Sequence, residues 1–306
     1  MRRTGCLYLA AVPVLITAAA YFLVPGDSSE APAAKDPATV SQLSREDAKA
    51  KAESSAAAER AADDKVIAGL PPGLAAPDKK ELAHRILSTA ETSTLDWRSS
   101  YGYIEDLDDG QGYTAGIAGF CTGTHDLLAL VERYTEEHPG NGLARYLPAL
   151  REVDGTDSHE GLDPRFTSAW RAEAKLPAFQ RAQVRERDRV YFAPAVRLAK
   201  LDGLGTLGQF IYYDAMVLHG PDTDPNGFYG MREQALRKAD TPAAGGDERA
   251  YLNAFLDIRR DAMLARKSTA DTSRIDTAQR RFLNAGNLEL RTPLEWSMYG
   301  ETYRVP

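Results

Sequence analysis

Two charged residues interrupt the apolar faces of two predicted helices, and they restrict how this chain can fold. In the stretch LGQFIYYDAMVLHG, apolar residues recur at helical spacing over 207–218, and the same face carries Asp214. In YLNAFLDIRRDAM, the face over 252–263 carries Arg259. An unpaired buried charge is costly, so we expect Asp214 and Arg259 to meet, joined by Arg274 of DTSRID. Such a pair either only ties the helices together or also sets the pKa of a nearby carboxyl.

The chain from residue 73 onward has the pattern of a mainly α-helical domain. The stretches YGYIEDL and GYTAGIAGF flank the turn residues DDGQG, which predicts a short antiparallel pair with a glycine-rich bend. The stretch THDLLALVERYTEEHPG predicts a helix capped by Thr124 and stopped at Gly140. We therefore expect an α+β fold of two helical lobes with a small antiparallel sheet beside a cleft. Further helices are predicted at 141–153, 176–192, 194–202, 205–219, 228–239, 247–266 and 276–284.

The first 72 residues have a different composition. The basic start MRRTG is followed by CLYLAAVPVLITAAAYFLV, an uncharged apolar run that is typical of an export signal. The run is almost long enough to span a bilayer and no clear cleavage site follows it. Residues 1–25 are therefore predicted to be a signal peptide of a secreted, extracellular protein, with an uncleaved membrane anchor as the alternative. Residues 26–72 hold almost no large apolar side chain and are predicted to form a flexible linker, which leaves 73–306 as the folded domain.

Charge, cysteine and histidine usage narrow the function. The net charge of -7 argues against a nucleic-acid partner and is compatible with a cationic substrate, although it is also ordinary for a soluble protein. Cys121 is the one cysteine left after a signal is removed, and we expect it to be a buried core residue. The histidines show no metal-ligand spacing, and His84 is predicted on a polar helix face. No phosphate loop or dinucleotide fingerprint is present, so no metal or cofactor is expected.

One glutamate ends a predicted apolar helix. The stretch PPGLAAPDKKELAHRIL predicts a helix that begins at Pro77, and Glu91 falls at its C-terminal end. The helix dipole disfavours a free acid at that position, which makes Glu91 a candidate for a functional role.

An acidic bend follows that helix and suggests two-carboxylate chemistry. Hydrolysis of a glycosidic bond needs one protonated carboxyl that donates to the leaving oxygen and a second that activates water or attacks directly. Glu91 fits the acid, because partial burial favours the protonated form. Thr114 could hold a water by its hydroxyl. The residue types alone leave the base open among four acids of the bend, which are Glu105, Asp106, Asp108 and Asp109.

These residues carry a resemblance to a known family. The stretches STAETSTLDW and YGYIEDLDDGQGYTAGIAGFCTGT resemble the active-site region of bacterial chitosanases of glycoside hydrolase family 46. The similarity continues in the same order through GNGLARYLPAL, ERDRVYFAPAV, GQFIYYDAMVLHGP, GGDERAYLNAFLDIRR, DTSRIDTAQRRFLNAGNLEL and PLEWSMYG. It covers the chain from Leu74 to the C-terminus and leaves out the N-terminal segment and the linker.

The resemblance implies a lysozyme-like fold of two lobes and endo-hydrolysis of β-1,4 links in chitosan with inversion at the anomeric carbon. It implies chitosan or glucosamine oligosaccharides as partners and no cofactor. We also expect a monomer that meets a membrane only if the N-terminal segment stays attached. The implied roles are Glu91 as general acid, Asp109 as general base, Thr114 as a water-positioning residue, Asp214, Arg259 and Arg274 as the supporting network, and Ser93, Tyr103 and Asp126 as substrate-binding residues.

The chain also departs from the family pattern. Gln111 stands in the bend where the family often has arginine, and Arg266 and Lys267 make the stretch before Arg274 poorer in acids. Both changes bear on subsite preference. Trp97, Trp170 and Trp296 are predicted to belong mainly to the core.

Two other functions remain open at this point. One is a lysozyme-like peptidoglycan hydrolase, which would use the same two-carboxylate chemistry. The other is a non-catalytic, membrane-tethered chitosan-binding protein, which would bind the polymer without turnover.

Overall fold

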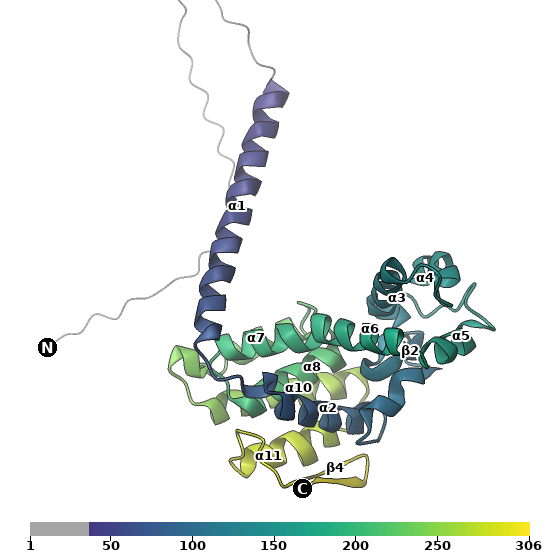
Figure 1. Cartoon of the computed structure of the whole chain (residues 1–306). Coiled ribbons are helices and arrows are strands. Elements are labelled where there is room, and N and C mark those ends of the chain that lie inside the picture. The colour runs from purple at the N-terminus through teal and green to yellow at the C-terminus, as the bar shows by residue number, and fades with distance from the viewer. Residues whose placement is uncertain (1–36) are drawn as a thin grey trace, which may run out of the picture. The chain divides into compact units, whose positions relative to one another are not determined.

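The computed structural model describes residues 37–306, and the predicted signal peptide or anchor therefore lies outside the described residues. Within 37–306, no helix combines the length and apolar character needed to cross a membrane. Residues Pro37–Ala68 form one helix, α1, whose side chains over 51–68 are mostly exposed. The linker assignment for 26–72 remains a prediction, but residues 37–68 of it form a continuous helix (Figure 1).

Helices make up most of residues 59–306, which cluster as one unit. The α-helices are α2 Pro77–Glu91, α3 Asp126–Glu137, α4 Leu147–Val153, α5 Phe166–Glu173, α6 Pro177–Arg187, α7 Ala193–Leu201, α8 Thr206–His219, α9 Phe228–Leu236, α10 Glu248–Arg266 and α11 Arg280–Asn284. The π-helices are η6 Asp188–Phe192 and η8 Arg274–Gln279. The 3-10 helices are η1 Gly73–Ala75, η2 Trp97–Gly102, η3 Gly116–Ala118, η4 Thr122–Thr124, η5 Ala144–Tyr146 and η7 Pro242–Ala244.

Helix α2 has the start and end that the sequence predicts. Pro77 occupies the first turn, where its missing N–H costs no helical hydrogen bond, and Glu91 is the last helical residue. The apolar face from Leu82 to Ala90 is buried. The prediction for His84 was wrong: this side chain is also buried, because it packs edge-on against three aromatic rings rather than facing solvent. The three rings belong to Trp97, Phe192 and Tyr213.

The predicted antiparallel pair is confirmed. Strand β1 (Ile104–Asp106) pairs with β2 (Tyr113–Ala115), and β2 pairs with β3 (Phe120–Cys121). A second antiparallel pair, β4 (Leu294–Met298) with β5 (Glu301–Val305), was not predicted. Its buried residues alternate along β4 as in an ordinary half-buried strand.

The start of α3 also differs from the prediction. The helix begins at Asp126, and its N-cap residue is His125, whose φ is 67°. Thr124 does not cap the helix, because its hydroxyl donates to Asp126 Oδ1 at 2.7 Å.

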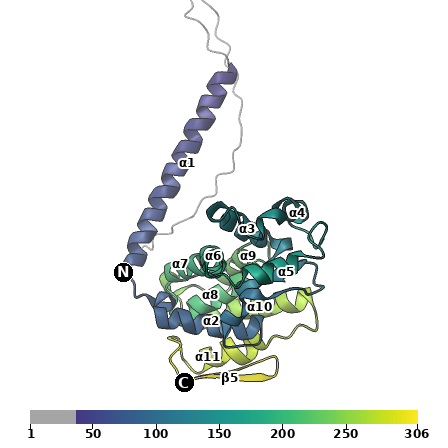
Figure 2. The ribbon, with the colours of Figure 1, turned by 45° about the vertical axis from the view of Figure 1, so that its right-hand side comes forward.

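The mainly α, α+β class is confirmed, with α3, α4, α5 and the first sheet gathered at one end of the unit (Figure 1). The helices α2, α8, α10 and α11 form the other end, and the view in Figure 2 agrees with this grouping. Trp97, Trp170 and Trp296 are all buried, as expected for core residues. Helix α8 is buried over Thr206–Met216 and lies centrally among its neighbours, so a charge on it must find a partner inside the protein.

Candidate active site

Glu91 contacts an arginine from a distant part of the chain. The guanidinium of Arg274 donates through Nη2 to Glu91 Oε1, and the Glu91 side chain keeps 21% of its surface exposed. Arg274 itself is almost fully buried. A cation at this position also opposes the negative end of the α2 dipole, which explains how an acid can close the helix.

Behind Arg274 lies the predicted pair of buried charges, and the prediction that they meet is confirmed. Asp214 on α8 accepts from Arg274 Nε at 3.1 Å and from Arg259 Nη2 at 2.6 Å. Arg259, on α10, is fully buried. Burial by itself would raise the pKa of Asp214, but Arg274 and Arg259 reverse this effect and hold that pKa below its ordinary value. Asp214 is therefore an anion that fixes both arginines, one of which reaches Glu91.

Gln279 completes this network and was not found by sequence reasoning. Its Nε2 donates to Asp214 Oδ2 at 2.7 Å, and its Oε1 accepts from Arg259 Nη1 at 2.9 Å. Residues 274 and 279 lie five positions apart in the π-helix η8, where hydrogen bonds run from i to i+5. α-Helical spacing of 3.6 residues does not place these two side chains together, so the periodicity carried no signal for Gln279.

Asp109 lies in a different setting, on the exposed bend between β1 and β2. Its Oδ1 accepts from the backbone N–H of Gln111 at 3.1 Å, and its Oδ2 lies 3.5 Å from Gln111 Nε2. Asp108, Gly110 and Gly112 in the same bend have positive φ angles. A Cβ on Gly112 would lie 2.2 Å from Thr122 Oγ1, so only glycine fits there. The bend thus presents Asp109 to solvent through local turn geometry.

The strand after the bend is anchored through an aromatic stack. The ring of Tyr113 lies 3.9 Å from that of His159 at an angle of 6°, and its hydroxyl donates to Asp163. Burial, together with the Asp163 contact, raises the pKa of Tyr113 to about 12. Asp106 lies 3.2 Å from His159 Nε2, and this contact is an ion pair only when His159 is protonated. These contacts hold both strands that carry the bend.

The side chains of Thr114 and Glu91 both lie next to Gly119. A Cβ on Gly119 would lie 3.5 Å from Thr114 Cγ2 and 3.6 Å from Glu91 Oε2. The φ of Gly119 is +63°, which also favours glycine. Thr114 Oγ1 lies 3.2 Å from Cys121 Sγ. The Cys121 thiol donates a hydrogen bond to the Gly119 carbonyl at 3.1 Å. When the thiol proton goes to that carbonyl, the threonine hydroxyl donates to sulfur and keeps its lone pairs free to accept from a water.

Cys121 has the character predicted for it. It is a free cysteine with 6% exposure. Burial is the main cause that raises its pKa to about 12, and the negative charge of nearby Asp126 adds to the effect. A thiol with so high a pKa stays protonated and is not a nucleophile at neutral pH.

Comparison with known proteins identifies the family. The model of "Glycosyl hydrolase family 46" matches residues 85–294, a range that contains Glu91, the acidic bend and the whole arginine network. The chain belongs to glycosyl hydrolase family 46. It is 58% identical over 233 residues to a chitosanase of Streptomyces sp. (strain N174), covering 76% of this chain and 84% of that protein. A chitosanase of Nocardioides sp. (strain N106) is 54% identical over the same length and with the same coverage.

A solved structure supports the same fold. The co-crystal structure of chitosanase OU01 with substrate matches with a TM-score of 0.75 and 50% identity, covering 76% of this chain and 99% of that chain. The lysozyme-like class expected for a family 46 enzyme is therefore confirmed.

Asp126 of this family 46 enzyme is buried, and the sequence did not indicate its partners. Its Oδ1 accepts from the Cys121 N–H at 2.8 Å and from the Thr124 hydroxyl, and its Oδ2 accepts from Tyr191 of η6. Burial raises the pKa of Asp126 to about 6 despite these donors. The carboxyl thus ties β3 to α3 and η6, and its predicted contact with substrate remains a prediction.

The other predicted binding residues are more accessible. Ser93 is exposed just after α2, with a φ of 51°. Tyr103 is half-buried, and its hydroxyl donates a long hydrogen bond of 3.5 Å to Glu105 Oε2. Arg266 and Lys267 are both exposed at the end of α10. The structure does not join these residues to the Glu91 network by a hydrogen bond among the described residues.

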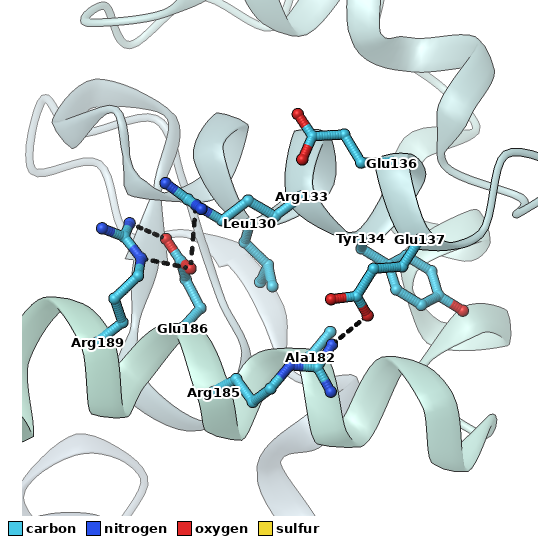
Figure 3. A pocket seen from close by; sticks show the side chains of 9 residues that line it. All are labelled: Leu130, Arg133, Tyr134, Glu136, Glu137, Ala182, Arg185, Glu186 and Arg189. Atoms are coloured by element: carbon cyan, nitrogen blue, oxygen red, sulfur yellow. Dashed lines mark hydrogen bonds and ion pairs between the residues drawn. The ribbon is translucent and has the colours of Figure 1, made fainter.

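A cavity of about 290 Å³ is lined by residues of α3, α6 and η6 (Figure 3), and neither Glu91 nor Asp109 belongs to its lining. Its charged side chains largely pair with one another: Glu186 binds Arg189 and lies near Arg133, and Glu137 binds Arg185. Three arginines face three glutamates there, so the lining offers no excess of negative charge to a cationic sugar.

Proposed function

We propose that the protein is an endo-acting chitosanase that cleaves β-1,4 links in chitosan with inversion of the anomeric carbon. Membership of family 46 supports a glycoside hydrolase, and the relatives named chitosanase support chitosan as the substrate class. The observation that carries the assignment of roles is the chain of contacts from Arg259 through Asp214 and Arg274 to Glu91. It fixes one carboxyl in a partly buried position, with a second carboxyl on an open bend nearby in sequence.

Glu91 is the general acid in this proposal. Its carboxyl donates a proton to the glycosidic oxygen as the bond from that oxygen to the anomeric carbon breaks. The network restricts the side chain to one orientation, since Arg274 is itself fixed by Asp214. Asp214 also accepts a hydrogen bond from the Arg274 guanidinium. The positive charge of Arg274 is therefore shared between the carboxyls of Asp214 and Glu91. Positioning of this kind is worth a large part of a catalytic rate.

Asp109 is the general base. It takes a proton from a water whose oxygen attacks the anomeric carbon from the face opposite the leaving group, which produces inversion. An exposed carboxylate suits this role, because the base has to be ionised and in contact with water. Thr114 accepts a hydrogen bond from the same water, since its own hydroxyl proton can go to the sulfur of Cys121.

The substrate preference follows from charge. A polymer of glucosamine is polycationic, and carboxylates near the scissile bond pair with its amino groups, whereas neutral chitin offers no such partner. We assign Ser93, Tyr103 and Asp126 to contacts with the sugar chain. Gln111 removes a positive charge that the family often has in the bend, which changes local binding without changing the reaction type.

The assignment is tested by turnover on defined polymers. The purified protein should release reducing ends from deacetylated chitosan and not from bacterial cell walls. Activity on cell walls alone would replace the proposal with a peptidoglycan hydrolase. Glu91→Gln should lower kcat by about 10²–10⁴-fold while chitosan binding, measured by co-sedimentation with the polymer, is kept. Binding without turnover by the unmodified protein would instead indicate a non-catalytic binding protein.

A further inference from the structure

The C-terminal hairpin β4–β5 contacts both segments that supply the Glu91–Arg274 pair. On the α2 side, Trp296 Nε1 donates to the buried Thr89 hydroxyl at 3.0 Å. On the η8 side, the Thr277 hydroxyl donates to the Ser297 carbonyl at 2.7 Å. The family model ends at residue 294, so these contacts come from a part of the chain beyond that match. Figures 1 and 2 both show the hairpin, in yellow, next to α11 and below α2.

The turn of this hairpin reaches the pair most directly. Tyr299 and Gly300 occupy the turn with φ angles of 51° and 84°, a combination that a two-residue hairpin loop of type I′ requires. The Tyr299 hydroxyl donates to the Ala90 carbonyl at 3.0 Å, and its backbone N–H donates to Ser273 Oγ at 3.0 Å. Ala90 directly precedes Glu91, and Ser273 directly precedes Arg274. One residue therefore holds the two chain segments that carry the ion pair.

The hydrogen bond from the Tyr299 hydroxyl uses an acceptor that would otherwise lack a partner. The Ala90 carbonyl belongs to the last turn of α2, where carbonyls have no helical donor. Burial raises the pKa of Tyr299, an effect that Glu91 strengthens and Arg274 opposes, so the hydroxyl stays protonated and able to donate. A tyrosine in the left-handed region is uncommon and persists where its surroundings fix it. The side chain still keeps 44% of its surface exposed, beside a carboxyl that must admit substrate.

We propose that Tyr299 is a positioning residue that fixes Glu91 relative to Arg274. This inference rests on the general-acid role proposed for Glu91. Its hydroxyl sets the end of α2 and its backbone sets the start of η8, so removal of either contact lets the carboxyl rotate away from its productive orientation. A misplaced catalytic group lowers the rate of the chemical step and leaves binding of the polymer largely unchanged.

The test compares Tyr299→Phe with a matched variant in the same hairpin, Tyr303→Phe. Tyr303 stacks on Trp296, and its hydroxyl makes no hydrogen bond within residues 37–306. On glucosamine hexamer, Tyr299→Phe should lower kcat by about tenfold with KM changed less than about twofold, whereas Tyr303→Phe should match the unmodified protein. An unchanged kcat, or a change confined to KM, would overturn the inference. Melting temperatures should be similar for the two variants.

A second variant guards against a loss of folding. Ser273→Ala keeps the tyrosine and removes only the acceptor of its N–H, and a severalfold fall in kcat is expected at unchanged KM. If Tyr299→Phe does not fold and Ser273→Ala has normal kcat, the inference is wrong. Failure of the proposed function is separate, because it would appear as an unmodified protein inactive on chitosan or as Glu91→Gln with full activity.

Discussion

The two proposed catalytic carboxyls are held in opposite ways. Glu91 is fixed by residues from four distant segments: Arg274 and Gln279 on η8, Asp214 on α8, Arg259 on α10 and the hairpin after residue 293. Asp109 is fixed mainly by its own bend, through hydrogen bonds from Gln111 and glycine conformations.

This difference has a physical reason in the proposed chemistry. A proton donor has to keep one orientation toward the leaving oxygen, and a rigid buried network supplies that orientation. A base that activates water has to be solvated, and an exposed turn supplies that setting. We call Glu91 and its supporting network the acid side, and Asp109 with its bend and flanking strands the base side. Substitutions far from the reacting groups should lower activity through the acid side, whereas only local substitutions should do so through the base side.

The largest expected effect is at the bend. Asp109→Asn should lower kcat on chitosan by about 10²–10⁴-fold, because the amide cannot take a proton from water. Asp108→Asn is the matched control, since asparagine tolerates the positive φ of 52° at that position and the change removes one neighbouring charge. Its kcat should stay within about twofold of the unmodified protein. Equal losses in the two variants would mean that the bend acts through its total charge and not through Asp109.

The acid side should be sensitive to a residue that does not touch substrate. Asp214→Asn leaves Arg259 and Arg274 buried without their anion, and such a loss typically costs about 3–5 kcal/mol in the free energy of unfolding. Asp257→Asn removes an exposed acid of α10 from its pair with Arg280 and should cost less than about 1 kcal/mol. Urea unfolding of both variants measures this contrast. A small effect at Asp214 would remove the distinction between the two regions.

A smaller, pH-dependent effect should come from Asp126, the buried acid of the base side. Its pKa is raised to about 6, so near pH 5 the folded protein holds a proton that the unfolded chain has released. Stability from this group is present below the ordinary pKa and is lost as pH rises through about 6. The loss is about 2–3 kcal/mol between pH 4 and pH 7. Asp126→Asn should lack this part of the pH dependence in urea unfolding, and identical pH profiles would contradict the assignment.

Much of the acid side could be predicted from the sequence because it is built on regular helices. Asp214 and Arg259 stand on apolar faces, and the cost of an unpaired buried charge was enough to predict their contact. Gln279 could not be predicted, since it depends on a π-turn that helical periodicity does not anticipate. The burial of His84 was missed for a similar reason, because three aromatic rings from other segments surround it.

The base side was less predictable, because a turn carries no periodic pattern. Residue types predicted the bend and its flanking strands, but four acids fitted the role equally well. The family resemblance, and not the local chemistry, narrowed these to Asp109. The hairpin 294–305 was also missed, although the alternation along Leu294, Trp296 and Met298 followed by Gly300 was a readable strand and turn signal.

The stereochemistry of the product reports directly on the proposed roles of Glu91 and Asp109, since a water activated by Asp109 opposite the leaving group allows only one outcome. Proton NMR of glucosamine hexamer during the first minutes of hydrolysis resolves the anomeric signals before they equilibrate. We expect the α-anomer of the new reducing end to appear first. Initial formation of the β-anomer would contradict it, because retention requires a covalent intermediate in place of direct attack by water.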